Sequence, residues 1–201
     1  MKVLVIGGSG TIGAAVADAL RGGGHEVVTA GRGSGDLRVD ITSPDSIRQL
    51  YGQAGRVDAV VSCAGGGAWK PLDQLSDGDF EHSLHYKLMG QVNLVRSGLE
   101  QVADGGSITL TSGVLSQEPM PGSSAISLVN AGLEGFARAA ALEAPRGVRV
   151  NVVSPPWVAE TLQAMGMDPS GGMPAVQVAR AYVDAVQGAH NGQTLDARKY
   201  A

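Results

Sequence analysis

Near the start of the chain stands the stretch Gly7-Gly8-Ser9-Gly10-Thr11-Ile12-Gly13. The continuous apolar run 3–6 precedes it, which is typical of a strand buried on both faces, and residues 12–20 after it have helical periodicity. Glycines between a strand and a helix permit a tight turn and let the backbone N–H groups of the helix start approach a pyrophosphate. The stretch therefore predicts a dinucleotide-binding loop, and the alternative is a glycine-rich turn without a ligand.

The end of the second expected strand, 26–30, indicates which dinucleotide is bound. An acidic residue at this point would bind the ribose 2′-hydroxyl of NAD, whereas an arginine would bind the 2′-phosphate of NADP. The chain has Arg32 here, followed by Ser34, so the pattern favours NADP(H). Asp36 lies in the same loop and complicates this interpretation, and the alternative is that Arg32 is a solvated surface charge.

Strand and helix patterns alternate along the rest of the chain. Ser43-Pro44 predicts a helix start, with serine as the N-cap and proline in the first turn. Residues 155–174 are rich in Pro, Gly and Met, and we expect a mobile loop over the substrate there. The other expected strands are 59–61, 108–111, 148–153 and 193–196, and the other expected helices are 77–101, 124–143 and 175–187. This alternation predicts an α/β fold, a Rossmann-type doubly wound parallel sheet in three layers, as a single domain spanning 1–201.

Composition limits the class of partner. The chain has 201 residues, 43% of them hydrophobic and 17% charged, which indicates a folded core. A net charge of −4 argues against a nucleic-acid partner or an anionic membrane surface. The single cysteine, Cys63, excludes an internal disulfide and fits a reducing cytosol. We therefore expect a cytoplasmic protein with a small-molecule substrate, no nucleic-acid partner and no membrane partner.

The order of these signals resembles the short-chain dehydrogenase/reductase family over nearly the whole chain. The turn Cys63-Ala64-Gly65 resembles the family's Asn-Asn-Ala-Gly, with Cys in place of Asn, and Asp40-Ile41 resembles its adenine-contacting pair. The segment 151–158 resembles the Asn-x-x-x-Pro-Gly segment along the nicotinamide, and 191–193 resembles the Gly-Gln that opens the last strand. The loop and the resemblance together imply an NADP(H)-dependent oxidoreductase whose cofactor contacts Gly7, Ser9, Gly10, Thr11, Ile12, Gly13, Arg32, Ser34, Asp40, Ile41, Cys63, Ala64, Gly65, Pro155 and Val158.

The catalytic positions of the family do not match this chain. The family uses a Ser at the end of the fifth strand, a Tyr-x-x-x-Lys on the following helix and an Asn on the preceding helix. Ser112 supplies the serine, but the resemblance puts Ile126 at the Tyr position, Asn130 at the Lys position and Lys87 at the Asn position. The Lys and the Asn have exchanged places, and the Tyr is missing.

This exchange changes the expected chemistry. Isoleucine cannot transfer a proton, whereas Ser112 can polarise a carbonyl by hydrogen bonding. A desolvated lysine can have a pKa low enough for proton transfer, so we expect Lys87 to act with Ser112 and Asn130, within hydrogen-bonding distance of one of them or of the cofactor. Tyr86 is adjacent to Lys87, and helical geometry lets at most one of the two face the cofactor.

Two other functions fit the same pattern. The chain could bind NADP(H) without turnover, as a sensor or as a partner of another protein, which the missing Tyr favours. It could also be a non-redox isomerase or dehydratase that uses the same pocket. The helix 124–143 is apolar around much of its circumference, and the sheet can cover only one side of it, so we also expect a homodimer.

Overall fold

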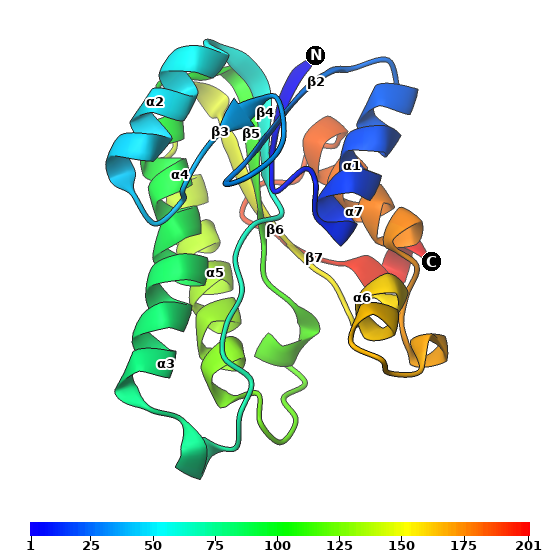
Figure 1. Ribbon diagram of the computed structural model, residues 1–201. Helices are drawn as coiled ribbons and strands as arrows, with labels where there is room; N and C mark the ends of the chain where they lie inside the picture. Colours follow the sequence, from blue (N-terminus) through cyan, green and yellow to red (C-terminus); the bar gives the residue numbers. More distant parts are fainter.

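The computed structural model describes all 201 residues and shows a parallel sheet between two layers of helices (Figure 1). The seven strands have the order β3-β2-β1-β4-β5-β6-β7, and every neighbouring pair is parallel. This confirms the Rossmann-type doubly wound fold. The strands are β1 (Lys2–Ile6), β2 (Glu26–Gly31), β3 (Leu37–Arg38), β4 (Val57–Ser62), β5 (Val102–Thr111), β6 (Arg149–Ser154) and β7 (Thr194–Asp196).

The helices divide between the two faces of the sheet (Figure 1). Helices α2 (Pro44–Ala54), α4 (Gly90–Gly98) and α5 (Ser124–Glu143) cover one face, and α1 (Thr11–Gly22) and α7 (Ala175–Gln187) cover the other. Ser43 caps α2 as expected, because its hydroxyl accepts the N–H of Ser46 and Pro44 occupies the first turn. Two short helices, α3 (Asp77–His82) and α6 (Ala159–Ala164), lie beyond the end of the sheet.

The core has two halves, one on each side of the sheet. Leu4 and Ile6 of β1 point into the half beneath α2, α4 and α5, whereas Val3 and Val5 point into the half beneath α1 and α7. All four side chains are fully buried, which explains why the run 3–6 is apolar without alternation. Full burial of such a side chain contributes about 1.5–3 kcal/mol before conformational entropy is subtracted.

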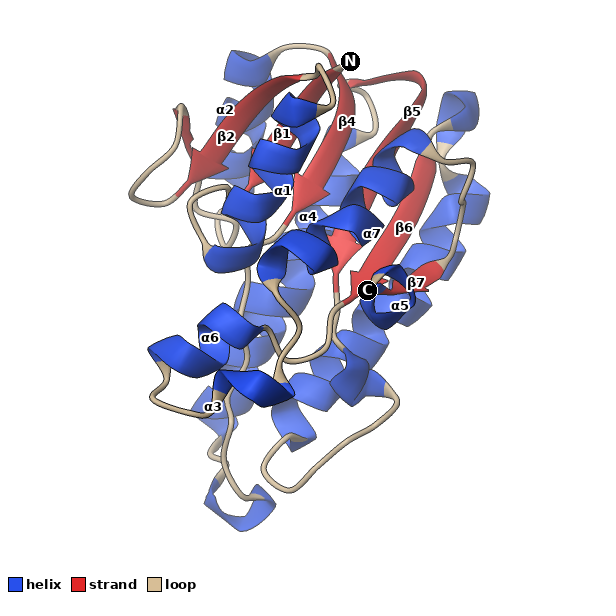
Figure 2. Cartoon of the chain, turned by 90° about the vertical axis from the view of Figure 1, so that its right-hand side faces the viewer, coloured by secondary structure: helices blue, strands red, loops and turns tan.

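The strand order places a crevice at one end of the sheet. The chain passes from β1 outward to β2 and β3, then returns to pair β4 on the other side of β1. The arrows of β2, β4 and β6 point towards the end of the molecule where α3 and α6 lie (Figure 2), and the other strands are parallel to them. Ligands of doubly wound folds bind outside the carboxyl ends of the strands at the point where the order reverses. The loops that follow β1, β2, β4, β5 and β6 therefore form the candidate site.

Several boundaries differ from the sequence prediction. The segment 155–174 is not irregular throughout, because it contains α6 and a bridge between Val158 and Met173. The Glu160 carboxylate accepts the N–H of Ala175 at 2.9 Å and fixes this segment to the start of α7. A helix of 6 residues is too short to show periodicity, so the sequence pattern missed it.

The expected helix 77–101 is interrupted, and two strands differ. It consists of α3, a π-helical segment over Ser83–Met89, and α4, which ends at Gly98. Strand β5 begins at Val102 instead of 108, with an irregular register before Ser107. Strand β3 has only 2 residues, and no sequence pattern predicted it.

Candidate functional site

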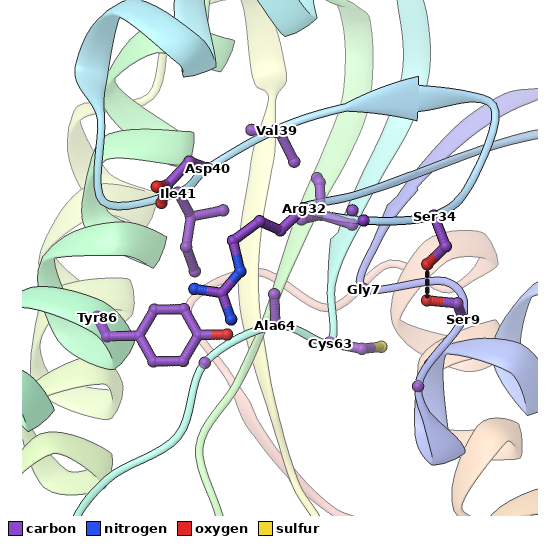
Figure 3. A pocket seen from close by; sticks show the side chains of 15 residues that line it. Gly7, Ser9, Arg32, Ser34, Val39, Asp40, Ile41, Cys63, Ala64 and Tyr86 are labelled. Carbon is purple, nitrogen blue, oxygen red and sulfur yellow. Dashed lines mark hydrogen bonds between the residues drawn. The ribbon is translucent and has the colours of Figure 1, made fainter.

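A first cavity of about 420 Å³ lies at the carboxyl ends of β1, β2 and β4 (Figure 3). It brings together ten of the expected cofactor contacts: Gly7, Ser9, Gly10, Arg32, Ser34, Asp40, Ile41, Cys63, Ala64 and Gly65. The remaining walls come from Ile6, Gly31, Gly33, Val39 and Tyr86. Residues from four separate loops therefore converge where the topology predicts a ligand.

The glycine-rich loop leads into an uncapped helix N-terminus. Helix α1 begins at Thr11 with Gly10 as its N-cap, no side chain caps it, and its first turn holds no acidic residue. Its free N–H groups and positive dipole end suit a phosphate. A Cβ at Gly13 would lie 2.0 Å from the Gly7 carbonyl oxygen, so only glycine lets the helix approach the loop this closely. Gly13 thus shapes the loop from beneath without lining the cavity, and Thr11 is exposed on the first turn.

A cation and two hydroxyls line the side of the cavity that follows β2. The Arg32 guanidinium lies over the Tyr86 ring, 5.9 Å from its centroid, and the hydroxyls of Ser9 and Ser34 are 2.6 Å apart (Figure 3). Asp36 does not compete for this cation, because its carboxylate accepts the N–H and the hydroxyl of Thr29, both at 2.8 Å, which lowers the pKa of Asp36. The cavity therefore offers Arg32 as the partner for a phosphate.

Asp40 lies at the far end of the same cavity. Its carboxylate accepts the hydroxyl and the N–H of Thr42, at 2.7 and 2.9 Å, and these hydrogen bonds lower the pKa of Asp40. The fixed anion and the buried side chain of Ile41 beside it provide a polar edge and an apolar face, which suits a nucleobase.

A second cavity of about 400 Å³ adjoins the first and shares Cys63 and Gly65 with it. It brings together the three expected catalytic residues, Ser112, Lys87 and Asn130, with Ile12 and Pro155 of the expected cofactor contacts. Val158 lies elsewhere: it is buried in the core beside α7 and lines neither cavity. The rest of the wall is Gly66, Gly67, Trp69, Thr111, Gly113, Val114, Leu115, Ile126, Pro156, Trp157, Thr161 and Met165.

Lys87 is buried in the wall of the second cavity. Only 7% of its surface is exposed, and burial lowers the pKa of its ammonium to about 8. Its Nζ donates to the backbone carbonyl of Ser112 at 3.0 Å, so Lys87 reaches Ser112 as expected, through the carbonyl instead of the hydroxyl. Gly65, at φ +114°, passes close beneath it, since a Cβ there would lie 3.1 Å from the Lys87 Cα.

The π-helical segment decides where two adjacent side chains point. Tyr86 lines the first cavity and Lys87 lines the second, so both face the candidate site, contrary to the expectation that at most one would. A π-helical turn holds more residues than an α-helical turn and is frequent at functional sites. Just after this segment, Gln91 in α4 binds β5, because its side chain accepts the N–H of Thr111 and donates to the Thr111 carbonyl, both at 2.9 Å. Sequence reasoning did not place Tyr86 in the wall of the first cavity, because nothing in the sequence signals this segment.

Glu134 binds the hydroxyl proton of Ser112. Ser112 Oγ donates to Glu134 Oε1 at 3.0 Å, and the same carboxylate accepts Ser116 Oγ at 2.6 Å and Gln117 Nε2 at 3.4 Å. A serine hydroxyl has one proton, so Ser112 presents acceptor lone pairs to the cavity. Sequence reasoning missed Glu134, although its position four residues after Asn130 on a helix places both on one face.

Asn130 is separate from Lys87 in the hydrogen-bond network. Its Nδ2 donates to the Gly113 carbonyl at 3.4 Å, and its Oδ1 is buried without a partner.

The Cys63 thiol cannot ionise at neutral pH, because burial raises its pKa to about 12. No tyrosine lines the second cavity, and Ile126 stands in its wall. Lys87 is therefore the only side chain of this wall that is cationic near pH 7.

Comparisons with known proteins match nearly the whole chain. The family model described as enoyl-(acyl carrier protein) reductase matches residues 8–187. The chain is 29% identical to hydroxynaphthalene reductase arp2 from Aspergillus fumigatus, over 89% of this chain and 76% of that protein. The crystal structure of the protein lin1944 from Listeria innocua is 41% identical, with a TM-score of 0.93 over 98% of both chains. A crystal structure described as a small-chain dehydrogenase in complex with NADPH is 27% identical, with a TM-score of 0.86 over 98% of this chain and 95% of that one.

No group of metal-ligating side chains lies close enough together to hold a metal ion. The helices are likewise all too short or too polar to cross a membrane.

Proposed function

The chain belongs to the short-chain dehydrogenase/reductase family, and we propose that it is an NADP(H)-dependent reductase of small carbonyl compounds in which Lys87 supplies the proton. The observation that carries the proposal is the buried ammonium of Lys87, with its pKa lowered to about 8, in a cavity that adjoins the dinucleotide cavity. An acid with a pKa near the working pH is suited to protonate an oxygen during reduction.

The residues of the first cavity fit NADP(H). The uncapped start of α1 and the space kept by Gly13 suit the pyrophosphate, and Arg32 with Ser34 suits the 2′-phosphate. Asp40 and Ile41 suit the adenine. The relative crystallised with NADPH supports the same choice of cofactor. The bound cofactor would supply the hydride, and Cys63 and Gly65, which line both cavities, would hold its nicotinamide end.

The side chains of the second cavity divide the remaining work. Lys87 directs its ammonium to the substrate oxygen and donates the proton, while the Ser112 carbonyl holds one of its three N–H groups in place. Glu134 binds the Ser112 hydroxyl proton, so that hydroxyl acts as an acceptor that orients the ammonium or a substrate donor. Asn130 donates to the carbonyl of Gly113, the residue after Ser112, and so supports the turn that carries Ser112. The apolar wall excludes water, which strengthens these hydrogen bonds.

One observation favours a second function, NADP(H) binding without turnover. The second cavity has no tyrosine, and the Ser112 proton is committed to Glu134, so the usual donors of the family are absent. In that case the chain would act as a sensor of NADP(H) or as a partner of another protein.

Following NADPH oxidation with a panel of aldehydes, ketones, quinones and enones separates the two functions. The reductase proposal predicts turnover of at least one carbonyl class, lost in Lys87→Met. Tight NADPH binding by calorimetry with no turnover of any member would overturn it in favour of the binding function.

We also propose that α5 joins two copies of the chain in a homodimer. One side of α5 is buried against the sheet by Val129, Leu133 and Ala137, yet Leu128 remains 49% exposed and Leu142 remains 89% exposed. Exposed apolar side chains along one helix suit a two-fold interface. A dimeric mass by sedimentation at micromolar concentration is expected, and Leu128→Glu is expected to lower it. A monomeric mass for the unaltered chain would refute the dimer.

A further inference from the structure

Both tryptophans of the chain stand in the wall of the second cavity. Trp69 follows β4 and Trp157 follows β6, and their rings meet edge to face, with centroids 5.4 Å apart and planes at 62°. Aromatic residues make up only 4% of the chain, so the core is built almost without large rings. Trp69 nevertheless remains 42% exposed. An indole pair brought together from two distant loops, with free ring surface beside a cavity, suits contact with a ligand.

The rest of this wall combines apolar side chains with a few polar ones, and Lys87 is its one charged residue. Leu115, Ile126 and Met165 line it, and it contains no Asp, Glu or Arg. Ile126 packs directly against the backbone of Gly67, where a Cβ would lie 2.8 Å from its Cδ1. Among its polar residues Lys87 and Ser112 are neighbours, because Lys87 Nζ donates to the Ser112 carbonyl at 3.0 Å. The cavity therefore offers apolar surface for a hydrocarbon body, with Lys87 and Ser112 beside each other for an oxygen.

We propose that the second cavity binds a neutral ring-bearing carbonyl compound, stacked against Trp69 and Trp157 with its oxygen towards Lys87. This inference rests on the proposed function, since it takes the oxygen at Lys87 as the reacting one. A linear chain has no ring face for the indoles. A carboxylate would find no cation in the wall except Lys87, which must face the reacting oxygen.

Calorimetry with ten-carbon ketones tests the inference on the full chain loaded with NADP+. We expect 1-tetralone, which has an aryl ring, to bind about tenfold more tightly than linear 2-decanone. The reason is that each contact between aromatic rings contributes binding free energy beyond that of the apolar area it buries. Acetophenone is likewise expected to bind more tightly than 4-acetylbenzoate. In Trp157→Leu and Trp69→Leu the preference for the ring should fall to about twofold, with NADP+ affinity unchanged. Val176→Ala, an exposed apolar position on α7, is the control and should keep the full preference.

Binding and turnover fail separately in this design. Equal or tighter binding of 2-decanone, tighter binding of 4-acetylbenzoate, or no binding of any ketone would overturn the inference. Binding of 1-tetralone with the expected preference, without NADPH oxidation by any carbonyl of the panel, would support ring binding at the two tryptophans and refute the reductase. Oxidation of NADPH with linear ketones alone would support the reductase and refute the inference.

Discussion

The first and second cavities share Cys63 and Gly65, but they follow the family pattern to different degrees. Ten expected cofactor contacts line the first cavity, and its loop keeps the three glycines of the motif. The second cavity holds Lys87 where the resemblance implies an asparagine, Asn130 where it implies a lysine and Ile126 where it implies a tyrosine. The first cavity therefore agrees with the pattern that the resemblance implies, whereas the second departs from it at the positions for proton transfer.

The difference reflects what each half uses for recognition. A pyrophosphate is bound by backbone N–H groups and a helix dipole, which depend on glycines at fixed places and on few side chains. Proton transfer depends on one side chain at one distance from the reacting oxygen, and more than one residue type can supply it. A proton donor of another residue type is thus compatible with a first cavity that keeps the pattern for dinucleotide binding.

Lys87→Met should have the largest effect, and it tests whether the second cavity is catalytic. Turnover should fall by about 100-fold to 10,000-fold, the usual contribution of a general acid. NADPH affinity should stay within a few-fold, because the pyrophosphate is bound in the first cavity. Steady-state kinetics with calorimetry measure both, and Lys199→Met on the surface is the control. Equal loss of NADPH affinity would show that the two cavities are not separable.

Gly13→Ala tests the first cavity. The new Cβ would lie 2.0 Å from the Gly7 carbonyl oxygen, so the loop must shift, and NADPH affinity should fall by about 100-fold, within the range of overpacking costs. Gly22→Ala in the same helix is the matched control, since a Cβ there meets nothing within 4 Å. Calorimetric titration of both variants checks the contrast, and an unchanged affinity in Gly13→Ala would remove the loop from the binding site.

Arg32→Ala tests which dinucleotide the first cavity selects. NADPH affinity should fall by about tenfold, as for a partly exposed charge-assisted contact, while NADH affinity changes little. Arg48→Ala on the surface of α2 should alter neither. Dissociation constants for both cofactors give the answer. The assignment of Arg32 is wrong if the unaltered chain binds NADH as tightly as NADPH.

The pH dependence gives the smallest expected effect and connects turnover with Lys87. Burial lowers the pKa of Lys87 to about 8, and the proposed donor must be protonated. The reduction should therefore be fastest below pH 8, and its rate should fall as the pH rises through this pKa. Between pH 7 and pH 8.5 the protonated fraction, and with it the turnover number, should fall about fourfold. A rate constant that stays level from pH 7 to pH 10 would assign the proton to another group.

Local sequence patterns were sufficient to predict an element where one chemical requirement fixes the residue type. The apolar run 3–6, the cap at Ser43 and the helix Ser124–Glu143 all lie where the sequence predicts them. The helix α6 within the segment 155–174 was not predicted, because it is too short to show periodicity. Its place depends on the hydrogen bond between Glu160 and Ala175, 15 residues further along the chain. The π-helical segment could not be predicted from the sequence either, since its conformation depends on packing against β5 and Gly65.

Local sequence patterns determined the doubly wound fold and the glycine-rich loop between its first strand and helix, whereas the exchange of Lys87 with Asn130 is what the resemblance to the family implies. Periodicity and glycine spacing are local properties, and they are visible in one dimension. Only the tertiary structure decided that Tyr86 and Lys87 face different cavities, that Glu134 binds the Ser112 proton and that Trp69 meets Trp157. These contacts join residues on separate elements, so their geometry depends on how the elements pack, which no local pattern specifies.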